Sequence, residues 1–156
     1  MAGGFFGLKI KDRTVKLFDD GNTKLSTTTL PHVGRAVAKL LELPIGKLEK
    51  YKNGFVYVQS FCVSQMEMLN ALKKATGTED KDWKITKIPV DEAIAQGNND
   101  AQDGNRMGMV DVLYGMNFKP GMGGNFQRKS DNQFLGLDEE DLEEVVKGVV
   151  QEAEAT

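Results

Sequence analysis

The 156-residue sequence contains one cysteine, Cys62, and one histidine, His32. A single cysteine excludes a disulfide within this sequence and fits a reducing compartment. Because a transition-metal site draws on several thiolate and imidazole ligands at characteristic spacings, the same scarcity argues against a His/Cys metal centre. We therefore expect no metal ion in this chain.

Long apolar runs and blocks of one charge are also missing. No stretch approaches the roughly 20 apolar residues of a transmembrane helix, and the first residues lack the basic-then-apolar order of a signal peptide. The net charge is -3, with lysine and arginine scattered along the chain. No basic block therefore indicates nucleic acid or an anionic membrane as a partner, and we expect a cytoplasmic protein.

Glycine is plentiful, but it does not form a dinucleotide-binding loop. The chain opens MAGGFFGLKI, and a second cluster reads GMGGNF (121–126). A dinucleotide fingerprint requires a strand before the glycines and a helix after them. The first cluster precedes a strand-like run, and the second follows a predicted helix. We therefore assign no cofactor-binding residue, and flexible or loop glycines are the simpler interpretation.

Hydrophobic periodicity predicts an α/β protein. With 40% hydrophobic and 28% charged residues, the composition is that of an ordinary globular domain. Alternation predicts strands, and apolar spacing of three and four predicts helices. The expected strands are two within 8–18, then 24–30, 55–61 and 83–90, and the expected helices are 31–43, 64–77, a short one from 90, 106–116 and one from 138. The ranges 46–54 and 119–133 read as loops, and 97–105 reads as a helix-breaking segment.

Capping residues place several helix ends. Ser64 and Glu67 have the spacing of a capping box, and Gly77 suits the C-terminal cap of the same helix. Asp91 and Asp138 are the predicted N-caps of two later helices.

Candidates for chemistry are few, and each has a structural alternative. His32 could act as a general acid or base, but a lone histidine at a helix start is more often structural. Cys62 could be a nucleophile only with a base nearby, and a small buried apolar residue is the simpler interpretation. Four methionines at helical spacing are expected in the core: Met66, Met68, Met107 and Met109. We assign no catalytic residue.

Six segments follow one another along the chain: FDDGNTK, VGRAVAKLL, FVYVQSFCVSQMEMLNALKKATG, WKITKIPVDEAI, GGNFQ and LDEEDLEEVV. In this order they resemble the later half of NmrA-like and isoflavone-reductase-like proteins, which are atypical members of the short-chain dehydrogenase superfamily. Together they cover the chain from about Gly4 to about Gly148. One departure is that Pro31 and His32 stand where such proteins often carry acidic residues.

The resemblance implies a function for a longer parent protein. The parent would bind NADP(H) and would either reduce a small molecule or sense the redox state of the cofactor. Residues 1–156 would then form a single partial domain, an incomplete Rossmann-like sheet with flanking helices and a substrate-side α+β region. The units that carry the dinucleotide loop in this family have no counterpart in the sequence. The isolated chain is therefore expected to bind no cofactor.

Two further expectations concern partners. Ligands of open α/β sheets bind beyond the carboxyl ends of the strands, so we expect a substrate pocket formed by Phe5, Phe6, Thr28, Thr29 and His32, with the two aromatic rings as its apolar wall. The alternatives for the phenylalanines are docking on a core or a disordered terminus. The alternative function is a non-enzymatic interaction module that associates with itself or with a missing partner half through an exposed sheet edge, because FVYVQSF (55–61) reads as an interior strand without its neighbours.

Overall fold

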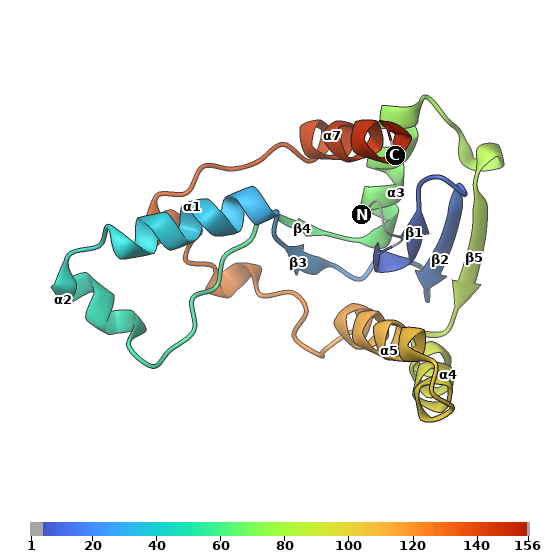
Figure 1. The fold of residues 1–156 in the computed structure, drawn as a ribbon, viewed down its shortest axis with the longest axis horizontal. Coiled ribbons are helices and arrows are strands. Elements are labelled where there is room, and N and C mark those ends of the chain that lie inside the picture. Colours follow the sequence, from blue (N-terminus) through green and yellow to red (C-terminus); the bar gives the residue numbers. More distant parts are fainter. Residues whose placement is uncertain (1–4, 156) are drawn as a thin grey trace. The chain divides into compact units, whose positions relative to one another are not determined.

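The computed structural model describes residues 5–155, apart from the side chain of Phe5, and confirms the α/β class (Figure 1). The strands are β1 (Leu8–Lys9), β2 (Thr14–Phe18), β3 (Leu25–Thr27), β4 (Phe61–Val63) and β5 (Lys84–Ile88). The helices are α1 (Leu30–Leu41), α2 (Ile45–Leu48), α3 (Gln65–Thr76), α4 (Val90–Gln102), α5 (Arg106–Phe118), α6 (Asn132–Leu135) and α7 (Leu142–Ala155).

Contacts divide the chain into two compact units. The first contains the described residues up to 25, residues 63–124 and those from 141 onward, and the second contains residues 26–62 and 125–140. Each unit is described by itself below. The expectation of one partial domain over 1–156 stays a prediction.

The first unit is built on a three-stranded sheet in the order β1-β2-β5. β1 and β2 are antiparallel, and β2 and β5 are parallel with Val15 beside Ile85. Because side chains alternate along a strand, Val15 and Leu17 lie on one face, where each is 1% exposed. Thr14, Lys16 and Phe18 of β2 therefore lie on the opposite face, from which Lys16 donates to Asp111 of α5.

Helices α3 and α7 pack against each other in this unit. The predicted capping box of Ser64 and Glu67 is present at the start of α3, and Gly77 ends the helix in the left-handed conformation. The prediction that Asp138 caps the last helix is wrong. Asp141 does so instead, because its carboxylate accepts the main-chain N–H groups of Glu143 and Glu144 at 2.8 and 3.0 Å.

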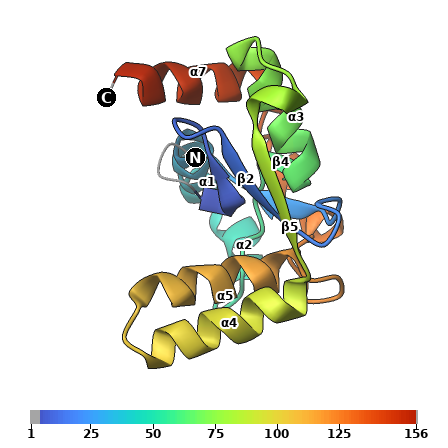
Figure 2. The same ribbon diagram turned by 90° about the vertical axis from the view of Figure 1, so that its right-hand side faces the viewer.

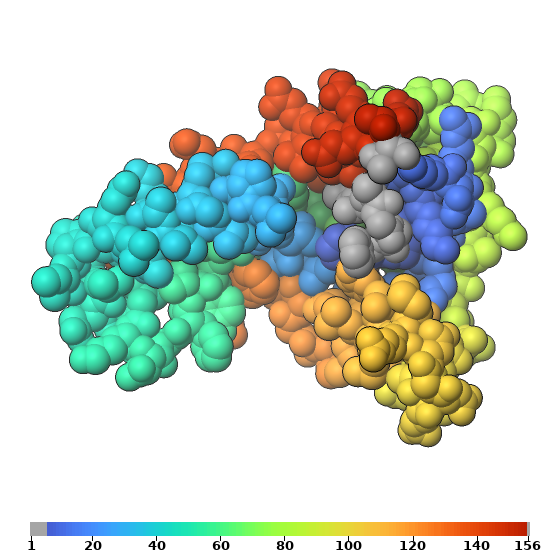
Figure 3. Space-filling view, viewed as in Figure 1, coloured from blue at the N-terminus to red at the C-terminus, as the bar shows by residue number. Residues whose placement is uncertain are grey.

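Helices α4 and α5 form an antiparallel pair, seen side by side in Figure 2 and as one continuous block of surface in Figure 3. The predicted break at 97–105 is wrong over its first six residues, since α4 continues to Gln102. Gly97 is buried, and a Cβ added there would lie 2.7 Å from the main-chain oxygen of Gly108 on α5. The two glycines therefore permit close helix packing rather than a turn. The prediction that Asp91 caps α4 is also wrong, because Asp91 lies in the first turn and the N-cap residue is Pro89. The N–H of Val90 donates to the carboxylate of Asp19.

The second unit contains α1, α2, α6 and most of the β3–β4 pair. Pro31 lies in the first turn of α1, as predicted. The strand expected over 55–61 is wrong, since only Phe61–Val63 is a strand. Side chains occupy its hydrogen-bonding groups instead, with Tyr57 N–H donating to Asp131 and Gln59 N–H donating to Asn132. The expected loop 46–54 contains the short helix α2 and a 3-10 turn at Glu49–Tyr51.

Candidate functional site

The residues predicted to form a substrate pocket belong to both units. Thr28, Thr29 and His32 lie where β3 leads into α1, in the second unit, and Phe6 lies in the first. The side chain of Phe5 is outside the described part of the structure. A pocket shared by these five residues therefore stays a prediction.

Phe6 packs against an aromatic cluster of the first unit. Its ring centroid lies 5.1 Å from that of Tyr114 and 6.4 Å from that of Phe118, and Phe18 stacks on Phe118 at 5.8 Å. These distances are in the range that aromatic pairs favour. Of the alternatives considered for this residue, docking on a core is the one observed.

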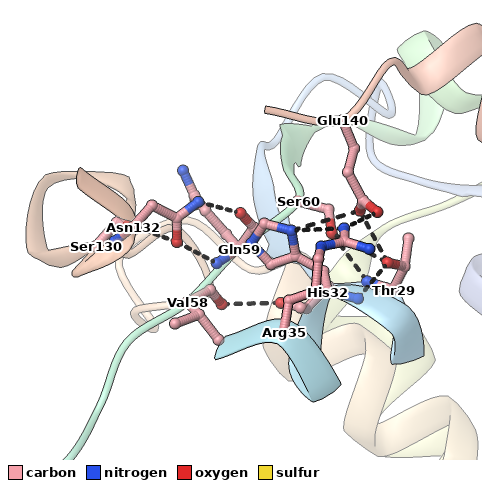
Figure 4. Close-up of polar contacts among 10 residues, drawn as sticks. Thr29, His32, Arg35, Val58, Gln59, Ser60, Ser130, Asn132 and Glu140 are labelled. Atoms are coloured by element: carbon pink, nitrogen blue, oxygen red, sulfur yellow. Dashed lines mark hydrogen bonds and ion pairs between the residues drawn. The ribbon is translucent and has the colours of Figure 1, made fainter. Parts of the chain in front are cut away.

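Thr29 organises a polar network in the second unit (Figure 4). As the N-cap of α1, its hydroxyl oxygen accepts the N–H of His32 at 3.2 Å. The same hydroxyl donates to Glu140 Oε2 at 2.8 Å, and Arg35 Nη2 donates to Glu140 Oε1 at 2.5 Å. Ser60 Oγ accepts the N–H of Thr29 at 3.0 Å. The cap thereby ties the start of α1 to a carboxylate more than a hundred residues away in the chain.

Glu140 is held as a carboxylate within this network. Burial raises its pKa, but hydrogen bonds from Ser60, Arg35 and Thr29 lower it by more, so that the pKa of Glu140 lies below its ordinary value. Hydrogen bonds donated to a carboxylate favour its charged form. The site therefore carries a negative charge at neutral pH, matched by the guanidinium of Arg35.

His32 is completely buried. Its Nδ1 lies 3.3 Å from Arg35 Nη2 and 3.8 Å from Glu140 Oε2. Its Nε2 is buried without a hydrogen-bond partner among the described residues. No imidazole edge reaches solvent, so this arrangement positions the helix and the carboxylate and offers no exposed acid or base. Thr28 is similarly occupied, donating to the main-chain oxygen of Val58 at 2.8 Å.

A second polar cluster forms hydrogen bonds with the segment 57–59, which precedes β4. Asp131 accepts hydrogen bonds from the N–H of Tyr57 at 3.0 Å and the hydroxyl of Tyr51 at 2.9 Å. Asn132 pairs with the main chain of Gln59 in both directions, accepting at 3.1 Å and donating at 2.6 Å, as Figure 4 shows. These contacts satisfy the main chain and serve the fold of the unit.

The first unit contains an open cavity of about 400 Å³ beside the sheet. Its lining comes from the strands and from α5: Gly7, Lys9, Thr14, Val15, Lys16, Phe18, Lys84, Thr86, Met107, Val110, Asp111 and Tyr114. A cavity of this size suits a small molecule. Sequence reasoning did not find it. The only available signal was the alternation that places Lys16 and Phe18 on one face of a strand. Met107, expected in the core, lines this cavity and is 65% exposed, and Met109 is 58% exposed.

The polar groups of the cavity are mainly cationic. Three lysines line it against one carboxylate, Asp111, which Lys16 Nζ approaches to 2.8 Å. Tyr114 adds a phenol whose pKa is raised by burial and lowered less by the main chain of Phe6, so that the group is neutral at physiological pH. The arrangement combines an apolar wall with excess positive charge.

The described residues contain neither a candidate metal site nor a candidate membrane-spanning helix. Within 5–155 no three His, Cys, Asp or Glu side chains come together as a possible metal site, and no helix there has the length and apolar character to cross a membrane. Cys62 is a free thiol at intermediate exposure rather than a fully buried residue.

Similarity to known proteins extends over nearly the whole chain. "Oxidoreductase aprR" of Aspergillus flavus is 26% identical over 148 residues, which cover 94% of this chain and 48% of that protein. "Oxidoreductase poxI" of Penicillium oxalicum is 27% identical over 150 residues, covering 93% of this chain and 45% of the relative. The chain is thus a distant relative of fungal oxidoreductases and spans about half of their length. No family model matches the sequence, and no solved structure matches it.

Proposed function

We propose that this chain is the substrate-side portion of an NAD(P)H-dependent reductase of small molecules of the NmrA-like type. The observation that carries the proposal is the relationship to two fungal oxidoreductases over almost the entire chain and about half of theirs. The cavity supports it, because small-molecule sites are concave and mainly apolar with a few placed polar groups. A redox sensor that binds the same cofactor without reducing a substrate is the closest variant of this function.

NADP(H) is assigned to a longer parent and not to this chain alone. The pyrophosphate of a dinucleotide binds at a helix N-terminus that follows a strand and a glycine-rich turn. Gly7 instead leads into β1, and residues 121–126 follow the end of α5. Neither Gly7 nor the second glycine cluster therefore has the strand–turn–helix setting that a dinucleotide requires.

A chimera tests the proposal. The matching segment of the Penicillium oxalicum oxidoreductase is replaced by this chain, and NADPH binding is measured by calorimetry for the chimera and for the chain alone. We expect binding by the chimera and none by the chain. Binding to the isolated chain at micromolar concentration, or a folded chimera that no longer binds NADPH, would contradict the assignment.

The second candidate, an interaction module, is favoured by the surface of α1. Leu30, Val37 and Leu41 are 85%, 51% and 72% exposed on this helix, whereas its buried residues are His32 and Ala36. An aliphatic face without charges is complementary to itself, which suits a two-fold contact with a second copy of the chain. The sheet edge is less suited, because the open strand β5 carries Lys84 and Lys87, and edge lysines oppose strand pairing.

Sedimentation equilibrium tests the second candidate. If α1 mediates self-association, the double substitution V37K/L41K converts a dimer to a monomer, and Met109→Lys on α5, also at an exposed apolar residue, leaves the dimer intact. A monomeric natural chain at high concentration would contradict the interaction module.

A further inference from the structure

The floor of the cavity of the first unit is formed by paired residues of the three-stranded sheet. The register of the sheet places Lys9 of β1, Thr14 of β2 and Lys84 of β5 side by side in one row. Neighbouring strands are about 4.8 Å apart, so the two lysines flank Thr14 at a separation of roughly 10 Å. All three residues line the cavity. The row therefore presents one ammonium group on each side of a hydroxyl.

The next rows of the same face become progressively apolar. Lys16 lies beside Thr86, and Phe18 lies beside Ile88. Lys16 is engaged with Asp111 at 2.8 Å, and the Thr86 hydroxyl donates to the main-chain oxygen of Val15 at 3.1 Å. The polar side chains of the second row are thus already hydrogen-bonded within the protein. The lysines of the first row, Lys9 and Lys84, carry the remaining positive charge of the floor.

Lys9 and Lys84 are unmatched by acids. Among residues 5–155, no carboxylate forms an ion pair with either ammonium group, whereas Lys16 has Asp111. Each lysine can donate up to three hydrogen bonds, and an ammonium group favours carboxylate or phosphate oxygens as acceptors. The first row therefore has the chemistry to receive an anionic group.

The opposite end of the cavity is apolar. Phe18 is 3% exposed and belongs to a core cluster with Phe118, against which Tyr114 also packs. Val110 and Met107 continue this wall along α5. An apolar body placed against this wall would be removed from water, which stabilises binding in proportion to the area covered.

We infer that the cavity is a binding site for a small amphiphilic anion, whose charged group lies between Lys9 and Lys84 over Thr14 and whose apolar body lies against Phe18, Val110 and Tyr114. The inference rests on the proposed function in one respect, that a small organic molecule is the ligand. It adds to that function the chemical class of the ligand. Carboxylates and phosphates share this chemistry, and the experiment separates them.

The test uses the full chain and three probes: 3-phenylpropionate, phenethyl phosphate and the neutral 3-phenylpropanol. Binding is followed by the amide shifts of a nitrogen-15 spectrum, without any dinucleotide. We expect one anion or both to bind with a dissociation constant of about 1 mM or tighter, shifting the amides of Lys9, Thr14 and Lys84. The neutral alcohol should bind about tenfold more weakly, because it lacks the charge-assisted contacts.

Matched variants locate the site. Lys84→Gln should weaken anion binding about tenfold, since one charged hydrogen-bonding partner is lost, and Lys84→Arg should retain it. Lys87→Gln is the control, because Lys87 is exposed on the same strand but its side chain alternates to the other face. Thermal melting confirms that each variant is folded. Equal loss in both glutamine variants, equal binding of the alcohol, or no shifts in the cavity would overturn the inference.

Failure of the two proposals can be told apart. A chain that binds the anion while the chimera fails to bind NADPH contradicts the proposed function and leaves the anion site in place. If the chimera binds NADPH and the chain binds none of the three probes, only the anion site is contradicted.

Discussion

Gln65 completes the hydrogen bonding of β2 beyond the first residue of β1, Leu8, which pairs with Val15. Its Nε2 donates to the main-chain oxygen of Lys16 at 2.9 Å, and its Oε1 accepts the N–H of Phe18 at 2.8 Å. The same Nε2 donates to the main-chain oxygen of Phe6 at 2.8 Å. The side chain is completely buried. One glutamine at the start of α3 thus takes the place of a further strand residue and holds the backbone of the cavity floor.

Gln65→Leu should be strongly destabilising. The variant has a similar volume but leaves the Phe18 N–H and the Lys16 carbonyl buried without partners, and each unsatisfied group costs about 1–3 kcal/mol. We expect a loss of about 2–4 kcal/mol in the free energy of unfolding, measured with urea. Gln151→Leu, at an exposed position on α7, should change it by less than about 0.5 kcal/mol. Equal effects of the two variants would contradict this role.

Replacing glycine by alanine should have opposite effects in two helices. In an open helical position the change stabilises by about 0.5–1 kcal/mol, and we expect this for Gly148 in α7, where an added Cβ meets no atom within 4 Å. Gly97→Ala should destabilise by about 1–3 kcal/mol, because the new methyl group is forced against α5. Thermal or urea unfolding measures both. A stabilised Gly97→Ala variant would show that α4 and α5 do not pack as closely as described.

Asp131 should make the second unit sensitive to acid. Burial raises the pKa of Asp131, but hydrogen bonds from the Tyr57 main chain, Tyr51 and Lys50 lower it by more, so that it lies below the ordinary value of 3.8. A carboxyl with a lowered folded-state pKa stabilises the fold above its unfolded pKa, and this contribution is lost as pH falls through the folded value.

Asp131→Ala tests this expectation. The variant should be less stable than the natural chain by about 2 kcal/mol at neutral pH, since charged hydrogen bonds are lost. The difference should shrink as the pH falls below 3.8, where the natural carboxyl becomes protonated. Urea unfolding of both proteins across this range gives the measurement. A difference that does not vary with pH would contradict the charged role of Asp131.

Thr29 should contribute to stability through its hydroxyl. Thr29→Ala removes the cap on the His32 N–H and the donor to Glu140, and loss of an N-cap costs about 1 kcal/mol, up to about 2. Thr29→Ser keeps the hydroxyl and should be close to the natural chain in the midpoint of urea unfolding. If the serine variant is as unstable as the alanine variant, the methyl group of Thr29 matters and the hydroxyl does not.

Local signals in the sequence were sufficient for several features of this protein. The capping box of Ser64 and Glu67, the left-handed Gly77 and the first-turn Pro31 all appear as predicted. These features depend on partners within about four residues, because a helix cap is made between neighbours in the chain. The α/β class followed from the same local periodicities.

The tertiary structure decided what depends on distant partners. Residues 55–60 have the composition of a strand, but Asp131, 74 positions after Tyr57, and Asn132 occupy their main-chain groups. Local sequence predicts a helix break at Gly97, but the residue lies inside α4 and is packed closely against α5. The lysines of the cavity form a row only once β1 and β5 are aligned on either side of β2. Hydrogen bonds and packing between segments far apart in the chain, which periodicity does not encode, produce each of these outcomes.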